Sequence, residues 1–282
     1  MRSISAKRFS LFDTLECGQT FTWIREGEGY VNADMGQVIY VEQKGDRLYY
    51  ETSSSEKVSL NRLFRLDDPL DEIQSEILRD GLMKQSIEFA PDLRIVRDPF
   101  FSCLVSFICS TCKNIPAIQM MMRNIRSELG PVYEFRGKMF HGLPAPERLA
   151  GMSLKGLEGL GLGYRAKYLK HSADVIARGD ITEEALGDMT YLEAHDSLKT
   201  LSGVGDKVAD CVCLFSLGFL EAFPIDVWIE RTIQEHYDVF TESGKSYTKK
   251  SVAARSYFGR YGGYAQQYLY YYARSRGKGP TC

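Results

Sequence analysis

The stretch Leu201–Cys211 reads LSGVGDKVADC and places a tight turn directly ahead of an apolar helix. Gly203 and Gly205 allow the backbone conformations that such a turn requires. The segment Tyr191–Thr200 before the turn also has helical periodicity and starts with a capping-box pattern. A helix, a turn of the form small-Gly-hydrophobic-Gly and a second helix make a helix-hairpin-helix, whose backbone amides can bind a phosphate.

Lys207 begins the second helix, where the positive end of the helix dipole disfavours a protonated amine. The apolar residues that follow would desolvate the amine further and favour its neutral form. A neutral amine is a nucleophile that attacks carbonyl-like carbon atoms and forms a Schiff base. Taken alone, Lys207 would more simply be an exposed residue that touches phosphate.

A second polar residue follows the turn by nineteen positions, in the stretch FPIDVWIER. Pro224 breaks the chain there, and Asp226 is placed to cap a helix over residues 227–237. The cap would hold the carboxylate ionised and oriented. A fixed carboxylate can stabilise positive charge on deoxyribose while an amine captures C1′. The pair therefore suits excision of a base, although Asp226 alone would be read as a cap.

The rest of the chain predicts an α+β protein. Between residues 20 and 52, short β-rich runs alternate with turn signals and predict a small antiparallel sheet. A hairpin-like insert follows residue 130, and from residue 146 onward the pattern is helical throughout. We expect an N-terminal sheet domain with flanking helices over residues 1–95 and a helical helix-hairpin-helix domain over residues 96–282. The other segments with helical periodicity are 70–80, 82–90, 100–110, 115–129 and 206–217.

Composition indicates an ordinary soluble protein. The 282 residues are 44% hydrophobic, without a signal-peptide pattern or a membrane-length apolar run. Seven cysteines, an odd number spread through apolar segments, suit the core of an intracellular protein better than a disulfide framework. The histidines and cysteines lack metal-ligand spacing. We expect a monomer without metal or cofactor, in the cytoplasm of a prokaryote, associated with the nucleoid, or in the nucleus of a eukaryote.

The formal net charge of −2 argues against nucleic acid as a partner, but the charge is unevenly distributed. The segment Gly244–Cys282 contains eight basic residues and no acidic one. Such a basic end either meets phosphate or is a solvated face, and the two alternatives are about equally supported.

The motifs together resemble the base-excision DNA glycosylases that carry a helix-hairpin-helix and a Gly/Pro-Asp loop. Four further stretches resemble the 8-oxoguanine DNA glycosylases within that superfamily: CGQTFTW (17–23), RDPFFSCLVSFICSTCKNI (97–115), LGLGYRAKY (160–168) and GGYAQQYLYYYAR (262–274). The resemblance spans nearly the whole chain in order. It implies Lys207 as the Schiff-base nucleophile and Asp226 as the carboxylate that stabilises the transition state in duplex DNA containing an oxidised guanine.

The resemblance also implies a base-recognition set. A flipped base would lie between Cys211 and the ring of Tyr270, in a pocket between the domains, with Gln266 reading its Watson–Crick edge. The backbone carbonyl of Gly18 would accept the extra N7 hydrogen of 8-oxoguanine, which guanine lacks. Without the resemblance, these four residues would be read as core, surface or turn residues.

The sequence departs from the family where the opposite cytosine is read. In relatives from higher organisms, asparagines and an arginine fill the gap left by the flipped nucleotide. Here the matching positions are Cys112, Lys113, Asn114 and Ala117. Neither Cys112 nor Ala117 can make the bidentate contacts that recognise a base edge, so we expect weaker discrimination for cytosine.

Two other positions would contact DNA. Tyr164 matches the aromatic residue that wedges into the duplex. Trp228 stands where the family usually has a histidine, which leaves only an indole donor for phosphate. Since only Cys282 follows Asp226, the four-cysteine iron–sulfur motif of a sister branch is absent. A glycosylase for another lesion and a non-catalytic DNA-binding module remain as alternative functions.

Overall fold

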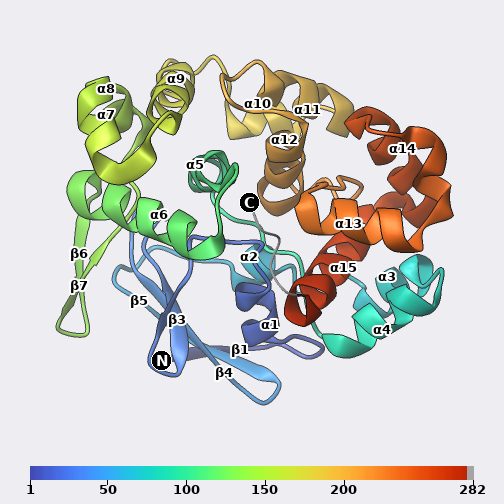
Figure 1. The fold of residues 1–282 in the computed structure, drawn as a ribbon. Helices are drawn as coiled ribbons and strands as arrows, with labels where there is room; N and C mark the ends of the chain where they lie inside the picture. Colours follow the sequence, from blue (N-terminus) through green and yellow to red (C-terminus); the bar gives the residue numbers. More distant parts are fainter. Residues whose placement is uncertain (278–282) are drawn as a thin grey trace. The chain divides into compact units, whose positions relative to one another are not determined.

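Five short strands form an antiparallel sheet in the order β1-β5-β4-β3-β2 (Figure 1). The structure is a computed structural model that describes residues 1–277. The predicted sheet between residues 20 and 52 is confirmed, and an additional edge strand, β1, pairs with β5. The strands are β1 (Arg2–Ser5), β2 (Ile24–Glu26), β3 (Gly29–Asn32), β4 (Ile39–Lys44) and β5 (Arg47–Thr52).

The predicted hairpin after residue 130 is also confirmed, as β6 (Val132–Phe135) and β7 (Lys138–His141). Both residues of its turn, Arg136 and Gly137, have positive φ, which matches the right-handed twist of the two strands. Phe135 of this hairpin packs into a hydrophobic cluster with residues of the sheet: Val31, Ala33, Val38 and Tyr40.

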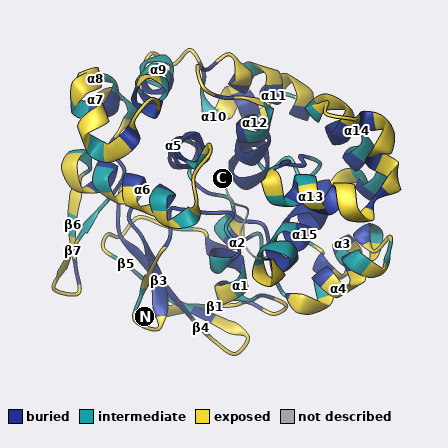
Figure 2. Cartoon of the chain, viewed as in Figure 1, coloured by how far each residue is buried: buried dark blue, intermediate teal, exposed yellow. Residues whose placement is uncertain are grey.

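Helices α5 and α6 have the bounds that their apolar periodicity predicts. Nearly all of α5 is buried, and it appears dark blue in Figure 2. Asn114 caps α6, and the predicted capping box of Thr190 and Glu193 begins α11. The helical elements of this part of the chain are α5 (Phe100–Ser110), α6 (Ile115–Leu129), α7 (Pro146–Ala150), α8 (Leu154–Leu157), η1 (Glu158–Leu162), α9 (Arg165–Ala177), α10 (Glu183–Gly187) and α11 (Tyr191–Lys199).

The remaining helices include those that carry the predicted catalytic residues. The predicted helix over residues 206–217 is present, with its second half wound as a π-helix. These elements are α1 (Leu11–Glu16), α2 (Leu60–Phe64), α3 (Leu70–Ile77), α4 (Gly81–Phe89), α12 (Asp206–Val212), η2 (Cys213–Leu217), α13 (Val227–His236), η3 (Asp238–Ser243), α14 (Tyr247–Phe258), η4 (Gly259–Tyr261) and α15 (Gly262–Arg276).

The contacts between residues divide the chain into two compact units, each built from three separate segments of the sequence. One unit comprises residues 1–7, 20–59 and 98–204, and the other comprises residues 8–19, 60–97 and 205–282. The first holds the sheet and α5 to α11, and the second is helical. These units do not follow a single boundary along the sequence, and the boundary expected between residues 95 and 96 stays a prediction. Within residues 1–277, no helix is both long and apolar enough to cross a membrane.

Candidate active site

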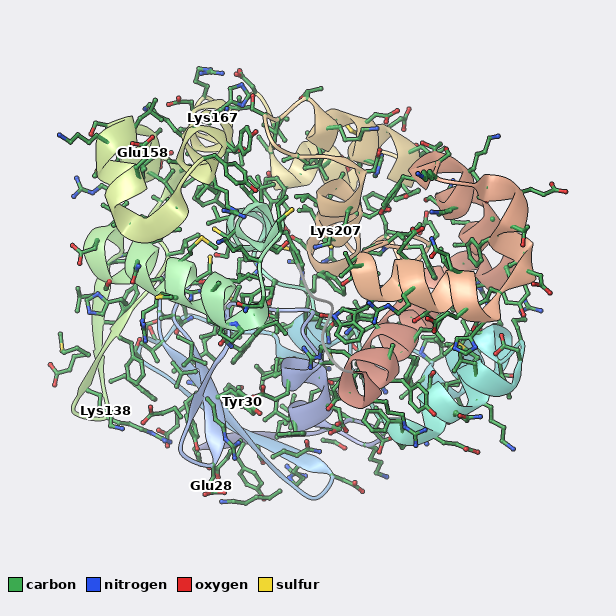
Figure 3. The ribbon with its side chains drawn as sticks, in the orientation of Figure 1. Glu28, Tyr30, Lys138, Glu158, Lys167 and Lys207 are labelled. Atoms are coloured by element: carbon green, nitrogen blue, oxygen red, sulfur yellow. The ribbon has the colours of Figure 1, made fainter. Side chains whose placement is uncertain are left out.

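Lys207 lies in the first turn of α12, directly after the predicted hairpin (Figure 3). Gly205 is the N-cap residue of this helix, and no side chain caps the helix start. Backbone amides at the start of a helix can bind an anion. Lys207 is partly exposed, whereas Val208 and the rest of the helix are buried. Lys207 thus lies at the more exposed end of a helix whose later residues, Asp210 among them, are buried.

Asp226 caps α13, as its position after Pro224 predicts. One carboxylate oxygen, Oδ1, accepts hydrogen bonds from the backbone N–H groups of Trp228 at 3.0 Å and Ile229 at 2.9 Å. Burial raises the pKa of Asp226, while these two amides and the charge of Lys207 lower it, and the net direction is upward. The charge of Lys207 thus reaches the Asp226 carboxylate, so the two groups lie in the same part of the helical unit. The expected pair is brought together.

Cys211 lies one turn after Lys207 on α12 and is 2% exposed. Burial raises the pKa of its thiol to about 12, although the nearby charge of Lys207 lowers it. At neutral pH, Cys211 is therefore an uncharged thiol. Asp226 acts on it electrostatically as well, so Cys211 lies near both Lys207 and Asp226.

Helix α15 contributes Gln266 and Tyr270, which lie one turn apart. Gln266 is 4% exposed, and its Oε1 has no hydrogen-bond partner among residues 1–277. A buried amide oxygen without a partner is costly unless a ligand supplies the donor. Tyr270 is partly exposed, and burial together with the charge of Asp226 raises its pKa. Tyr270 is thus also a neighbour of Asp226.

Gly18 follows α1 with a φ of 92°, a conformation that favours glycine. A Cβ at this position would lie 2.6 Å from Nη1 of Arg274 and 3.2 Å from the ring of Tyr270. Two side chains of α15 hold this turn: Arg274 donates to the carbonyl of Glu16 at 2.5 Å, and Gln267 donates to the carbonyl of Cys17 at 3.3 Å. The backbone of Gly18 therefore lies against Tyr270.

Gly203 is in the predicted hairpin and has a φ of 81°. A Cβ here would lie 2.3 Å from the ring of Tyr168 on α9, so the turn packs directly on that ring. The backbone N–H of Ser202 donates to Nδ1 of His171 at 3.2 Å, one turn further along α9. Side chains of α9 thus fix the first half of the turn.

Four further residues expected to contact DNA belong to the same unit as Gly203: Cys112, Lys113, Asn114 and Tyr164. Tyr164 is 52% exposed, and the guanidinium of Arg165 lies 4.4 Å from its ring centroid. Cys112 and Lys113 are exposed, and Cys112 has a φ of 52°. The side-chain oxygen of Asn114 accepts from the backbone N–H of Ala117 on α6, so the helix cap uses one of its two lone pairs.

Trp228 lines a cavity of about 340 Å³ whose lining includes neither Lys207 nor Asp226. The guanidinium of Arg231 lies 5.9 Å from the indole ring. Trp228 thus lines this cavity together with residues of α13 and α15, and its expected contact with phosphate stays a prediction.

The basic end of the chain is less available to phosphate than its charge suggests. Lys250 is 4% exposed and forms an ion pair with Glu230, and Arg260 is paired with Glu72 and Glu76. Lys278 and Cys282 lie outside the described residues. The alternative of a uniform basic DNA-binding face is therefore weakened.

Comparison with known proteins agrees with this arrangement. Residues 2–104 match the model of the 8-oxoguanine DNA glycosylase N-terminal domain, and residues 105–255 match that of the HhH-GPD superfamily of base excision DNA repair proteins. The chain belongs to the 8-oxoguanine glycosylase branch of the HhH-GPD superfamily.

Relatives of this branch resemble the chain over most of its length. A probable N-glycosylase/DNA lyase of Methanothermobacter thermautotrophicus is 31% identical over 223 residues, covering 71% of this chain and 69% of the relative. The 8-oxoguanine glycosylase/lyase of Clostridium acetobutylicum, solved with double-stranded DNA containing cytosine opposite 8-oxoguanine, is 33% identical with a TM-score of 0.88 and 98% coverage of both chains. A structure of MBOgg1 with a low-affinity DNA ligand is 31% identical, with a TM-score of 0.88, covering 99% of this chain and 100% of the other.

Two residues of this 8-oxoguanine glycosylase homologue that hold the backbone around Gly18 could not be identified from the sequence. Arg274 lies in the quoted stretch GGYAQQYLYYYAR but has no feature that distinguishes it from a surface arginine. Gln19 is fully buried and donates to the carbonyls of Thr14 and Arg94. The position of Gln19 next to a turn glycine is only a weak signal that it holds the backbone, because its partner Arg94 is distant in the sequence.

Proposed function

We propose that the protein is a bifunctional DNA glycosylase/AP lyase that excises 8-oxoguanine from duplex DNA. The observation that carries the proposal is one cluster in the helical unit. In this cluster the charge of Lys207 acts on the Asp226 carboxylate, and the charge of Asp226 acts on Tyr270. A Cβ on Gly18 would lie 3.2 Å from the ring of Tyr270. The cluster thus combines groups suited to breaking a glycosidic bond with groups suited to holding a base.

The chemistry follows from the two catalytic groups. Positive charge builds on the sugar as the N-glycosidic bond breaks, and Asp226 stabilises that charge. The lone pair of the Lys207 amine forms a bond to C1′, and the base leaves with the bonding electrons and takes up a proton. The sugar ring opens to give an imine between C1′ and Nζ. Loss of a proton from C2′ then expels the 3′ phosphate by β-elimination.

The lesion would be recognised when the flipped base stacks against, and forms hydrogen bonds with, residues of the same cluster. Tyr270 offers a stacking face, and Cys211 is a neutral thiol on the facing helix α12. The unpartnered Oε1 of Gln266 would accept a hydrogen from the Watson–Crick edge. The carbonyl of Gly18 would accept the N7 hydrogen that distinguishes 8-oxoguanine from guanine.

The remaining expected contacts hold the duplex. Amides at Gly203, Gly205 and the start of α12 would bind phosphate without a side chain. The exposed ring of Tyr164 would wedge into the helix, and Cys112, Lys113 and Asn114 would face the opposite strand. An enzyme of this kind would work where genomic DNA is held, in the prokaryotic cytoplasm or the eukaryotic nucleus.

The test is covalent trapping of the imine. Duplexes with 8-oxoguanine opposite each of the four bases, and a duplex with an abasic site, are incubated with the protein and reduced with borohydride. We expect an adduct with both kinds of duplex, its loss in Lys207→Gln, and its retention in Lys199→Gln, a lysine of the other helix of the motif. The yield should vary little between opposite bases, because Cys112 and Ala117 cannot read a base edge.

Other results of the trapping experiment would favour a different function or a different recognition residue. An adduct with the abasic site but none with 8-oxoguanine would assign the enzyme to another lesion. The absence of any adduct would contradict lyase chemistry and would leave Lys207 as a contact to phosphate. A strong preference for cytosine would show that other residues read the opposite base.

A further inference from the structure

Tyr247 joins the two segments that carry the catalytic pair through a single hydroxyl group. Its Oη donates to Oδ2 of Asp210 on α12 at 2.6 Å. The same Oη accepts the backbone N–H of Ile225 at 3.1 Å. We propose that Tyr247 is a positioning residue that holds Lys207 and Asp226 in register, a role that rests on the proposed function.

The two partners of Tyr247 are close to the catalytic residues in the chain. Asp210 lies three residues after Lys207, in the same short helix. Ile225 directly precedes Asp226, so its peptide sets the direction in which the chain enters α13. A phenol can donate one hydrogen bond and accept another at once. One side chain can therefore link the helix that carries Lys207 to the loop that precedes Asp226.

The surroundings make this bridge rigid. Asp210 is fully buried, so its carboxylate depends on protein donors. Burial and the charge of Asp210 raise the pKa of Tyr247 well above its ordinary value, so the phenol keeps its proton. Tyr247 is the first residue of α14, whose Lys250 is paired with Glu230 of α13. Helix α14 is thus anchored to α13 independently of the phenol.

The proposed role affects the rate of reaction more than binding. An error of about 1 Å in the placement of reacting groups can cost on the order of 100-fold in rate. Tyr247 itself lies behind the pair and contacts neither substrate nor reacting atoms in the proposed mechanism. Its loss should therefore lower the single-turnover rate of excision while the affinity for DNA stays unchanged.

A matched pair of variants separates positioning from general stability. Tyr247→Phe removes the bridging hydroxyl. Tyr264→Phe removes another phenol that donates to a buried carboxylate oxygen, that of Asp68, at 2.7 Å. Both variants leave a carboxylate short of one donor, but only Tyr247 is linked to the segment before Asp226.

Three measurements are made on both variants: the single-turnover excision rate with saturating enzyme on an 8-oxoguanine duplex, the Kd for a duplex with a stable abasic-site analogue, and the midpoint of urea unfolding. We expect the rate to fall about tenfold or more in Tyr247→Phe, with Kd within about twofold, and to stay near wild type in Tyr264→Phe. Equal rates in the two variants, or a loss in Tyr247→Phe that appears only in Kd, would overturn the proposal.

Replacement of Asp210 tests the same bridge from its other end. Asp210→Asn keeps an oxygen that accepts from the phenol, whereas Asp210→Ala does not. We expect Asp210→Asn to retain most of the rate and Asp210→Ala to lose as much as Tyr247→Phe, with no further loss in the double variant. Additive losses would contradict a shared bridge. Wild-type protein that gives no borohydride adduct would refute the proposed function itself, independently of these comparisons.

Discussion

Asp226 meets two requirements with one carboxylate group. Its Oδ1 accepts both capping hydrogen bonds of α13. In the proposed mechanism, the other oxygen, Oδ2, faces the positive charge that develops on the sugar. The cap fixes the orientation of the group, and burial together with Lys207 sets its charge. Asp226 can therefore cap α13 and, in the proposed mechanism, also act as the catalytic carboxylate.

Gly18 allows a test of lesion recognition at a single atom. In Gly18→Ala, the new Cβ would meet Arg274 and the ring of Tyr270, so the turn or the ring must shift. We expect at least a tenfold loss of 8-oxoguanine excision, while cleavage at a preformed abasic site persists because that reaction needs no base. Excision and abasic-site cleavage are measured in parallel under single-turnover conditions.

The matched control for this variant is Gly27→Ala. Gly27 also has a positive φ, of 60°, but no atom lies within 4 Å of its added Cβ. It therefore imposes a similar backbone strain without a steric clash. Equal effects of both variants on excision would refute a role of Gly18 in base recognition.

At the scale of elements, the hairpin turn depends on the ring beneath it. In Gly203→Ala, a Cβ would overlap Tyr168, and the residue would be strained at a φ of 81°. Because the turn and the ring must then separate, the amides that face phosphate are displaced. We expect the Kd for duplex DNA to rise about tenfold, which corresponds to about 1.4 kcal/mol. Fluorescence anisotropy at fixed salt measures this change.

Gly179→Ala serves as the control, since Gly179 has a φ of 75° and open space at its Cβ position. It lies after α9, outside the hairpin. An unchanged Kd in Gly203→Ala, or an equal rise in both variants, would show that the turn does not bind phosphate in this way.

Elements with strong periodicity or caps were predictable, and short ones without either were not. Helices α5 and α6 match their predicted ranges because apolar spacing and an Asn-Ile-Pro start define them. Strand β1 was missed because RSIS has no apolar alternation and its pairing partner, β5, is 45 residues away. Helix α1 is only six residues long, and Ser10, its cap, gives little signal alone.

The same distinction holds for the candidate site. Lys207 and Asp226 stand at helix starts that local signals define, and they could be found from the residues alone. Gly18 and Tyr270 meet across some 250 residues of chain, so only a resemblance to a family could pair them. The Tyr247 bridge joins three segments and has no local pattern at all.

At the scale of the whole molecule, one buried carboxyl group links stability to pH. Asp98 is 3% exposed and accepts hydrogen bonds from the hydroxyls of Thr20 at 2.6 Å and Thr22 at 2.9 Å. Burial raises its pKa from 3.8 to about 7, with a further rise from Asp34 and a partial offset from the two threonines and Arg126. The folded protein therefore binds this proton more tightly than the unfolded chain.

The direction of the effect follows from that difference. Below about pH 4 the group is protonated in both states, so its contribution to stability is fully present. As the pH rises from about 4 to 7, the unfolded chain releases the proton first, and the free energy of unfolding falls by up to about 1.4 kcal/mol per pH unit. Above pH 7 the contribution is lost and no longer changes.

Asp98→Asn isolates this contribution, because an amide keeps the shape and can bond to both threonines without titrating. Lys44 and Tyr40 lower the pKa of Glu42, and groups of this kind make stability rise with pH. That contribution is the same in the wild type and in Asp98→Asn. We therefore expect the variant to gain stability relative to wild type as the pH rises from 4 to 7, measured by urea unfolding at each pH. Parallel stability curves for the two proteins would show that Asp98 does not carry the raised pKa.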